Sequence, residues 1–143
     1  MRWWVAIPSP RRYPIPDVPV DMTKANNYLP DGYRNATPSL TVHDAAKALD
    51  FYEKGLGAKV TMRTPGPGGK IWHAEMMVGD SMVMVNDEFP GGLVVSPAQA
   101  KTTTVGMWVY VPDADGSYAK AVAAGAKSIA EPMDMFWGDR MAQ

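Results

Sequence analysis

The sequence has no cysteine, which excludes disulfide bonds, thiolate metal sites and a cysteine nucleophile. It has no strongly basic run and a net charge of −1, so binding to nucleic acid through its phosphates is not expected. No apolar stretch approaches the roughly 20 residues of a membrane-spanning helix. The apolar run 3–7 is too short for a signal-peptide core, and prolines follow it at once. We therefore expect a cytoplasmic protein without a membrane partner.

Familiar catalytic and nucleotide-binding motifs are also missing. The chain has no Ser-His-acid spacing and no dinucleotide fingerprint, and the glycine-rich stretch 65–69 contains prolines, which lack the amide donors that bind phosphate. Methionine and tryptophan are abundant, with 11 and 5 residues respectively. Because methionine fills irregular apolar space, these residues indicate either an adaptable apolar pocket or ordinary core packing.

The length of 143 residues fits a single domain, 1–143, with a sizeable core. Residues 2–7 have the composition of a strand. Residues 8–36 are rich in proline, which prevents a helix and favours an extended arm.

Regular structure is predicted to begin near Pro38. Residues 38–43 alternate apolar and polar side chains, as a half-buried strand does. Asp44 is a good N-cap for a helix that ends at Gly55 to Gly57. Gly79-Asp80 suits a two-residue hairpin. Further strands are predicted at 59–63, 70–78 and 81–86, and the acidic residues that follow are expected to be solvated.

The pattern then repeats about 70 residues later. Val42-His43-Asp44-Ala45 corresponds to Val111-Pro112-Asp113-Ala114, and Gly57-Ala58-Lys59 corresponds to Gly125-Ala126-Lys127. This repeat predicts a strand at 102–111, a helix capped by Asp113 or Asp115, a strand at 127–130 and room for one more strand. The predicted fold class is α+β, with two tandem βαβββ modules, 37–89 and an incomplete 101–143, forming an open, cup-like mixed sheet.

The stretch from Thr37 to Tyr52 resembles the opening of the vicinal oxygen chelate superfamily, which includes glyoxalase I, bleomycin-resistance proteins and extradiol dioxygenases. His73-Ala74-Glu75 with Val78-Gly79-Asp80-Ser81, and Phe136-Trp137-Gly138-Asp139-Arg140, are similar to its PhnB-like branch. In that branch a final strand of the type Gly-His-Arg-Trp-x-x-Ala-Thr follows. Residues 2–8 resemble this strand, so we expect residues 2–7 to complete the second module, in their own subunit or in a neighbour. The alternative is an open sheet preceded by a leader.

The resemblance also implies where a divalent metal would bind. Its ligand positions fall on Thr37, Val83, Gly106 and Trp4, and none of these is a competent ligand. His73 and Glu75 share one face of a strand and are the remaining candidate pair, although a hydrogen-bonded or ion-paired feature is the simpler interpretation. We therefore expect no metal and no other cofactor.

The resemblance implies a small-molecule site inside the cup. The candidate ligand-binding residues are Trp108, Tyr110, Phe136, Trp137, Arg140, Trp4 and Thr41. Aromatic walls with one arginine suit an aromatic or anionic organic ligand, although the rings could equally pack the core.

The predicted function is a metal-free binding protein of the bleomycin-resistance type, and no catalytic residue is identified. The alternatives are a metal-dependent lyase, isomerase or dioxygenase of the glyoxalase type, and a non-catalytic structural or regulatory dimer. A homodimer is expected, possibly with exchanged N-terminal strands.

Overall fold

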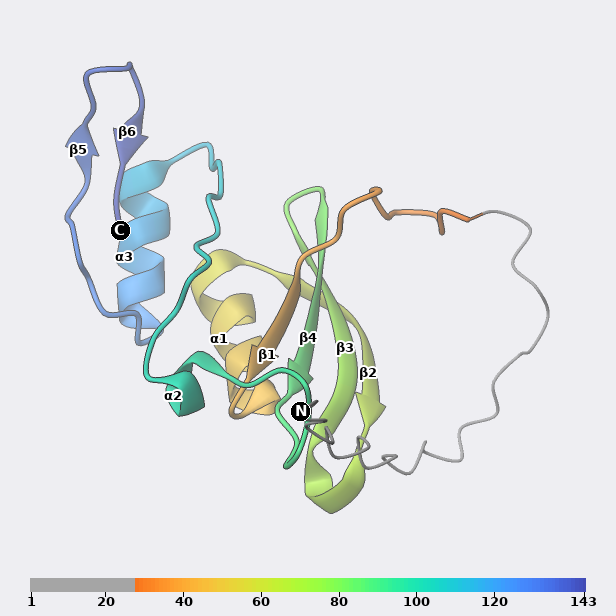
Figure 1. The fold of residues 1–143 in the computed structure, drawn as a ribbon. Coiled ribbons are helices and arrows are strands. Elements are labelled where there is room, and N and C mark those ends of the chain that lie inside the picture. Colours follow the sequence, from red (N-terminus) through yellow and green to blue (C-terminus); the bar gives the residue numbers. More distant parts are fainter. Residues whose placement is uncertain (1–27) are drawn as a thin grey trace, which may run out of the picture.

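The structure is a computed structural model that describes residues 28–143 (Figure 1). The strand expected at 2–7, the candidate Trp4 and most of the arm expected at 8–36 therefore lie outside the described residues. The elements, in chain order, are β1 (Ser39–Val42), α1 (Ala45–Leu56), β2 (Lys59–Pro65), the short 3-10 helix η1 (Pro67–Gly69), β3 (Ile71–Val78), β4 (Ser81–Asp87), α2 (Pro97–Ala100), α3 (Ala114–Ala123), β5 (Met133–Asp134) and β6 (Arg140–Met141).

Helix α1 has the ends that its sequence predicts. The Asp44 side chain accepts a hydrogen bond from the Lys47 amide at 3.1 Å, which satisfies one of the free donors of the first turn. Gly57 adopts a left-handed conformation with φ of 67°, which glycine reaches without steric cost, and ends the helix. Asp113 caps α3 in the same way, through the Gly116 amide. Both predicted caps are confirmed.

The first module forms a four-stranded mixed sheet in the order β1-β4-β3-β2. Strand β1 runs parallel to β4, and the other pairs are antiparallel. The β3–β4 hairpin turns at Gly79-Asp80, with φ of 61° at Gly79, as its sequence predicts. Helix α1 packs on one face, where Leu49 lies against a buried set made of Ala45, Ala58, Ile71, Ala74, Met76, Val78, Val83 and Val85. The module is thus a complete βαβββ unit.

The second half has a helix and a short hairpin, and the sheet stays open. Strands β5 and β6 pair at Met133 with Met141 and at Asp134 with Arg140. The strand predicted at 127–130 is reduced to backbone hydrogen bonds between Gln143 and residues 129 and 130. Figure 1 shows α3 and this hairpin beside α1, away from β2 and β3.

The predicted strand at 102–111 is wrong for the described chain, because residues 102–111 are irregular and pair with no strand of residues 28–143. The reason follows from the internal repeat. Among residues 28–143, β1 pairs with β4 and with no other strand. The segment that corresponds to β1 therefore depends on a fourth strand of the second module, and the described residues contain no such strand.

Two contacts hold the halves together. Gly55 of α1 lies against α3, and a Cβ added there would be 3.3 Å from the Ala124 Cβ and 3.4 Å from the Ala121 Cα. Val109, in the irregular segment, packs against the core of the first module. Its neighbours Val105, Trp108 and Tyr110 are exposed.

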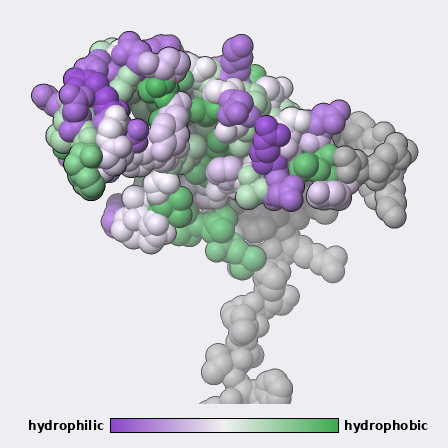
Figure 2. Space-filling view, turned by 90° about the horizontal axis from the view of Figure 1, so that it is seen from above, coloured by the Kyte–Doolittle hydropathy of each residue, from purple (hydrophilic) through white to green (hydrophobic). Residues whose placement is uncertain are grey.

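The surface mixes hydrophilic and hydrophobic residues, and green hydrophobic atoms reach the surface in several places in Figure 2. Among the described residues, no helix is long and apolar enough to cross a membrane.

Candidate functional site

The face of the four-stranded sheet that lies opposite α1 carries an unusual set of side chains. On β4, Val83 and Val85 are buried toward α1, so Met82 and Met84 project from the other face. On β3 the same alternation buries Ala74 and Met76 and turns His73, Glu75 and Met77 to the other face. Met62 of β2 pairs with Glu75 and shares that face. We call the group of Met62, Met77, Met82, Met84, His73 and Glu75 the methionine face.

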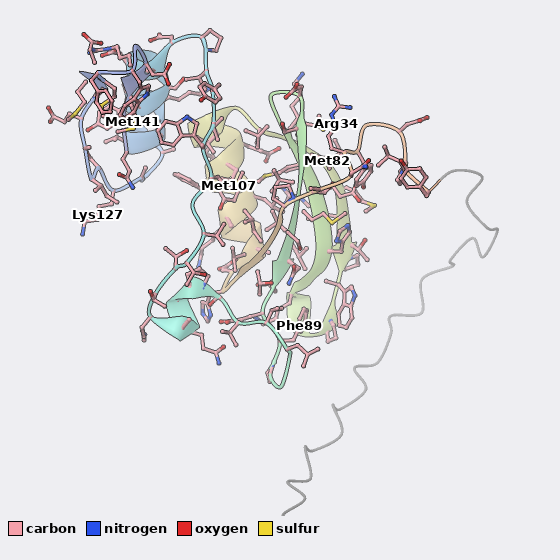
Figure 3. All side chains as sticks on the ribbon, turned by 45° about the horizontal axis from the view of Figure 1, so that its top comes forward. Arg34, Met82, Phe89, Met107, Lys127 and Met141 are labelled. Atoms are coloured by element: carbon pink, nitrogen blue, oxygen red, sulfur yellow. The ribbon has the colours of Figure 1, made fainter. Side chains whose placement is uncertain are left out.

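Strand register fixes the arrangement of the methionine face. Glu75 lies between Met62 on β2 and Met84 on β4, and Met77 lies opposite Met82 nearer the hairpin. Directly paired residues have Cβ atoms about 4.5–5.5 Å apart, so thioether groups border the carboxylate on both sides. Figure 3 shows Met82 near the start of β4, with Arg34 close by in that view.

Glu75 is the polar centre of this face. Its Oε1 atom lies 3.1 Å from Nε2 of His73, and the two side chains are 14% and 31% exposed. The Tyr33 hydroxyl also hydrogen-bonds Glu75, and this bond, with burial and the negative charge, raises the pKa of Tyr33 to about 12. Tyr33 therefore stays a neutral donor at physiological pH. His73 and Glu75, the candidate pair of metal ligands, therefore form a hydrogen bond, which was the simpler interpretation of their spacing.

A shallow cavity of about 180 Å³ lies at the end of β4. It is lined by Trp72, Asn86, Asp87, Phe89, Gly92 and Val94. The rings of Trp72 and Phe89 lie 5.0 Å apart and form an aromatic wall. Asn86 donates a hydrogen bond to the hydroxyl of Thr41 at 3.2 Å, which fixes this candidate ligand-binding residue on β1.

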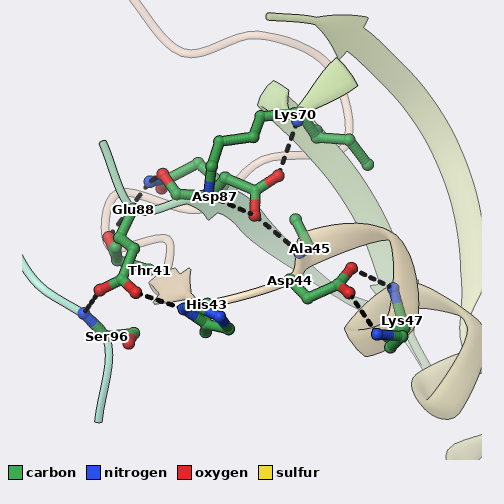
Figure 4. A network of polar contacts seen from close by, with 11 residues as sticks. Thr41, His43, Asp44, Ala45, Lys47, Lys70, Asp87, Glu88 and Ser96 are labelled. Carbon is green, nitrogen blue, oxygen red and sulfur yellow. Dashed lines mark hydrogen bonds and ion pairs between the residues drawn. The ribbon is translucent and has the colours of Figure 1, made fainter. Parts of the chain in front are cut away.

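Asp87, the last residue of β4, has a structural role. Its side chain is 4% exposed and accepts hydrogen bonds from the Ala45 amide at 3.0 Å and the Ile71 amide at 2.7 Å (Figure 4). Lys70 lies 3.7 Å away and balances the charge. The expectation that this acid is solvated is wrong. Asp87 continues the alternation of Val83 and Val85, and that period of two could have predicted its burial.

Glu88 joins the residue after β1 to the segment that precedes α2. It lies 2.6 Å from Nδ1 of His43, after β1, and accepts a hydrogen bond from the Ser96 amide at 2.8 Å, before α2 (Figure 4). The His43 hydrogen bond, followed by those from Ser96, lowers the pKa of Glu88 to about 2. We call these three residues the Glu88 clasp.

The aromatic residues predicted to line a cup lie on the second half and are open to solvent. Trp108 contacts Tyr110 at 6.5 Å between ring centroids, and Phe136 contacts Trp137 at 4.7 Å. Tyr110 is 81% exposed and Phe136 is 96% exposed. Within residues 28–143 no ring contact joins the two pairs. The structure therefore does not gather these four residues around one cavity, and their role in binding stays a prediction.

Arg140 was predicted to contact an anionic ligand. Its guanidinium donates to Asp115, with one hydrogen bond of 2.8 Å, and to Asp134 at 2.9 Å. The two carboxylates raise the pKa of Arg140, and the hydrogen bonds from the Arg140 guanidinium lower the pKa of Asp115. The arginine is exposed, but two acids already neutralise its charge.

The described residues do not fit the metal site that the resemblance implies. Val83, expected at a ligand position, is buried on the α1 face, and its neighbours on the methionine face are Met82 and Met84. Thioethers are poor ligands for hard divalent ions. Within residues 28–143 no group of three or more His, Cys, Asp or Glu side chains is placed to hold a metal ion.

Several residues of this site were not predicted from the sequence. The methionines at 82 and 84 follow the strand period, so their shared face could have been predicted. Tyr33 could not, because it belongs to an irregular arm that has no periodicity. The contact between Trp72 and Phe89 could not be predicted either, because only folding brings these two rings together.

Comparison with known sequences identifies the family of the chain. Residues 34–143 match the family described as Glyoxalase/Bleomycin resistance protein/Dioxygenase superfamily. An uncharacterised protein of Mycobacterium bovis is 39% identical over 107 residues, covering 73% of this chain and 70% of that protein. An uncharacterised protein of Mycobacterium tuberculosis H37Rv is 39% identical over 107 residues, covering 73% of this chain and 63% of that protein. The match thus spans less than two thirds of the second relative.

Solved structures share the fold. TioX from Micromonospora sp. ML1 is similar with a TM-score of 0.55 and 25% identity, covering 76% of this chain and 84% of that one. A PhnB protein from Bacillus cereus, described as a putative 3-demethylubiquinone-9 3-methyltransferase, has a TM-score of 0.53 and 14% identity, covering 75% and 87%. The second likeness concerns the fold alone.

Proposed function

The chain belongs to the Glyoxalase/Bleomycin resistance protein/Dioxygenase superfamily, and from this premise we propose that it is a metal-free binding protein for a small organic molecule. The methionine face, which lies opposite α1, is the proposed binding surface, and the cavity beside Trp72 and Phe89 extends it. An aromatic ligand suits this surface, because thioether sulfur packs favourably against rings. The anionic ligand that was the other expectation has less support, since Arg140 is paired with Asp115 and Asp134.

One observation carries the proposal. A half-buried carboxylate, Glu75, lies between two methionines on a strand face that the core does not use. Methionine side chains adapt their shape to different partners, and small-molecule sites typically combine an apolar lining with a few polar groups. His73 and Tyr33 supply such polar groups here.

A metal-dependent enzyme of the glyoxalase type is the second candidate. The observation in its favour is that His73 and Glu75 share one face and lie 3.1 Å apart, so both could contact one ion. A protein site for a divalent ion typically has three or more ligands, and the described residues supply these two at most.

A thermal-shift screen separates the candidates. The protein is heated with aromatic organic compounds, with glycopeptides and with divalent ions in separate wells. Because a ligand that binds only the folded state stabilises it by mass action, a rise in Tm with organic compounds supports the proposed binding protein. A rise with metal alone contradicts it and supports the enzyme. No rise with any of them contradicts both and leaves a structural or regulatory role.

A second measurement, methionine oxidation, tests where on the protein the ligand binds. Hydrogen peroxide oxidises accessible methionine side chains, and mass spectrometry reports the extent at each position. A ligand on the methionine face is expected to slow oxidation of Met62, Met77, Met82 and Met84. Met133 and Met141, on the hairpin of the second half, serve as internal controls. Equal protection at the control positions would contradict the assignment of the site.

We also propose a homodimer and a place in the PhnB-like branch. The dimer is supported by exposed apolar residues on the second half, among them Val105, Trp108 and Phe136. The branch is supported by the stretches at 73–75, 78–81 and 136–140 and by the fold likeness to the PhnB protein. Light scattering tests the dimer, and a monomeric mass at micromolar concentration would contradict it.

A further inference from the structure

We propose that the ligand of the methionine face is an organic cation, whose positive group pairs with Glu75 while its ring lies against the methionines. This inference rests on the proposed binding function and names its ligand class. An organic cation has the opposite charge to the anionic ligand that Arg140 suggests in the sequence.

The charges on the methionine face support a cation. Within residues 28–143 the ion-pair partner of the Glu75 carboxylate is a histidine, and no lysine or arginine pairs with it. Four lysine and arginine side chains of the described residues are paired with other acids: Lys47 with Asp44, Arg63 with Asp50 and Glu53, Lys70 with Asp87, and Arg140 with Asp115 and Asp134.

The partners of Glu75 leave room for a third donor. A carboxylate has about four lone-pair directions. His73 and the Tyr33 hydroxyl use two of them. A cationic N–H donor, such as the amino group of a protonated aminoaromatic ring, can take a further direction. The Glu75 side chain is only 14% exposed, so water screens this ion pair less than it would a surface pair.

The flanking methionines suit the rest of such a ligand. Met62 and Met84 lie directly beside Glu75 on the neighbouring strands. Thioether groups pack against aromatic rings and adapt to their outline. An aromatic ring joined to an amine therefore matches both parts of the site. Two cationic residues mark the hairpin end of the face: Lys59 pairs with Met77, and Arg34 lies near Met82 in the view of Figure 3. The amine is therefore expected at the other end, with His73 and Glu75.

Three probes of matched shape test the inference by isothermal titration calorimetry at neutral pH. They are 9-aminoacridine, which is a cation, acridine, which is mainly neutral, and acridine-9-carboxylate, which is an anion. We expect the cation to bind about tenfold more tightly than the neutral ring, because charge-assisted hydrogen bonds are roughly twice as strong as neutral ones. The anion should bind most weakly.

Three variants test whether Glu75 causes the preference for a cation. Glu75→Gln keeps the size and an acceptor for Tyr33, and we expect it to reduce the affinity for 9-aminoacridine about tenfold and that for acridine little. Asp80→Asn removes the same charge from the exposed tip of the same hairpin and should leave both affinities within about twofold. His73→Lys, which places a competing cation beside Glu75, should also weaken binding of 9-aminoacridine. Melting temperatures confirm that each variant is folded.

The outcomes separate this inference from the proposed function. Equal affinities for the three probes, tighter binding of the anion, or no effect of Glu75→Gln would overturn the cation preference and leave a binding protein. No binding by any probe would overturn the cation inference, and the thermal-shift screen then decides the proposed function independently.

Discussion

The carboxylate of Asp87 accepts a hydrogen bond from the amide nitrogen of Ala45 at 3.0 Å, across 42 positions of sequence. It thereby ties the last residue of β4 to the first residue of α1. The same carboxylate accepts from the amide of Ile71, at the start of β3. One buried side chain thus connects the helix to two strands of the first module.

Replacing Asp87 with alanine should destabilise the protein by about 2–5 kcal/mol, because two buried backbone donors lose their acceptor and Lys70 loses its partner. Urea unfolding followed by circular dichroism measures this change. The control is Asp80→Ala at the exposed hairpin tip, where less than about 0.5 kcal/mol is expected. Equal effects of the two substitutions would contradict a structural role for Asp87.

Gly55 allows α1 and α3 to lie in contact. A Cβ at this position would be 3.3 Å from both the Ala124 Cβ and the Phe51 ring. Gly55→Val should therefore cost about 1–3 kcal/mol through overpacking. Ala46→Val, on an exposed position of the same helix, changes helix propensity without this contact and should cost about 0.5 kcal/mol. If both variants unfold at the same urea concentration, the close helix contact is not important for stability.

The Glu88 clasp is expected to make the free energy of unfolding fall at acidic pH. Hydrogen bonds from His43 and Ser96 lower the pKa of Glu88 from 4.5 to about 2. Because the folded-state pKa lies below the unfolded one, the stabilisation is complete above about pH 4.5 and is lost as the pH falls toward 2. Glu88→Gln cannot titrate, so its free energy of unfolding should fall less steeply than that of the wild type over this range.

Urea titrations at several pH values between 6 and 2 measure both curves. The wild type should be more stable at pH 6, and the difference should shrink toward pH 2. Glu53→Gln, an exposed acid on α1, is the matched control. Parallel curves for the wild type and Glu88→Gln would show that the clasp does not contribute.

That residues 2–7 complete the second module stays a prediction. If they do so by pairing with the segment 102–111, the absence of native cysteine makes the pairing simple to test. Residues 8–27 can span roughly 65 Å when extended, which is more than the width of a domain of this size. Val5→Cys is combined in turn with cysteine at Met107, Trp108, Val109 and Tyr110. Adjacent strands bring Cα atoms within the roughly 4.4–6.8 Å that a disulfide needs.

Oxidation of each double variant should give one favoured cross-link if the segments are neighbours in a sheet. A cross-linked monomer indicates insertion in the same chain, and a cross-linked dimer indicates exchange between chains. Val5→Cys combined with cysteine at Asp80 is the control. Cross-linking that is equally weak at all four positions and at the control would contradict the strand pairing.

Local sequence determined the first module and the helices α1 and α3. Asp44, Asp113 and Gly57 have the physical properties of helix caps. The strand alternation in 73–78 and 81–87 specifies which side chains face α1. These features depend on neighbours in sequence, so they could be predicted without the fold. The second module could not be predicted as well, because the segment 102–111 has the composition of a strand but needs a partner strand to become one.

The features of the candidate site also fall into those that the sequence could predict and those that it could not. The sequence by itself determined the family, the shared face of His73 and Glu75 and the capped helices, because periodicity and local hydrogen bonding decide them. Only the tertiary structure decided that Arg140 is neutralised by Asp115 and Asp134, that Asp87 accepts hydrogen bonds from Ala45 and Ile71, and that Tyr33 and two methionines surround Glu75. Charge and burial depend on residues that are distant in sequence, and the folded chain alone brings these residues together.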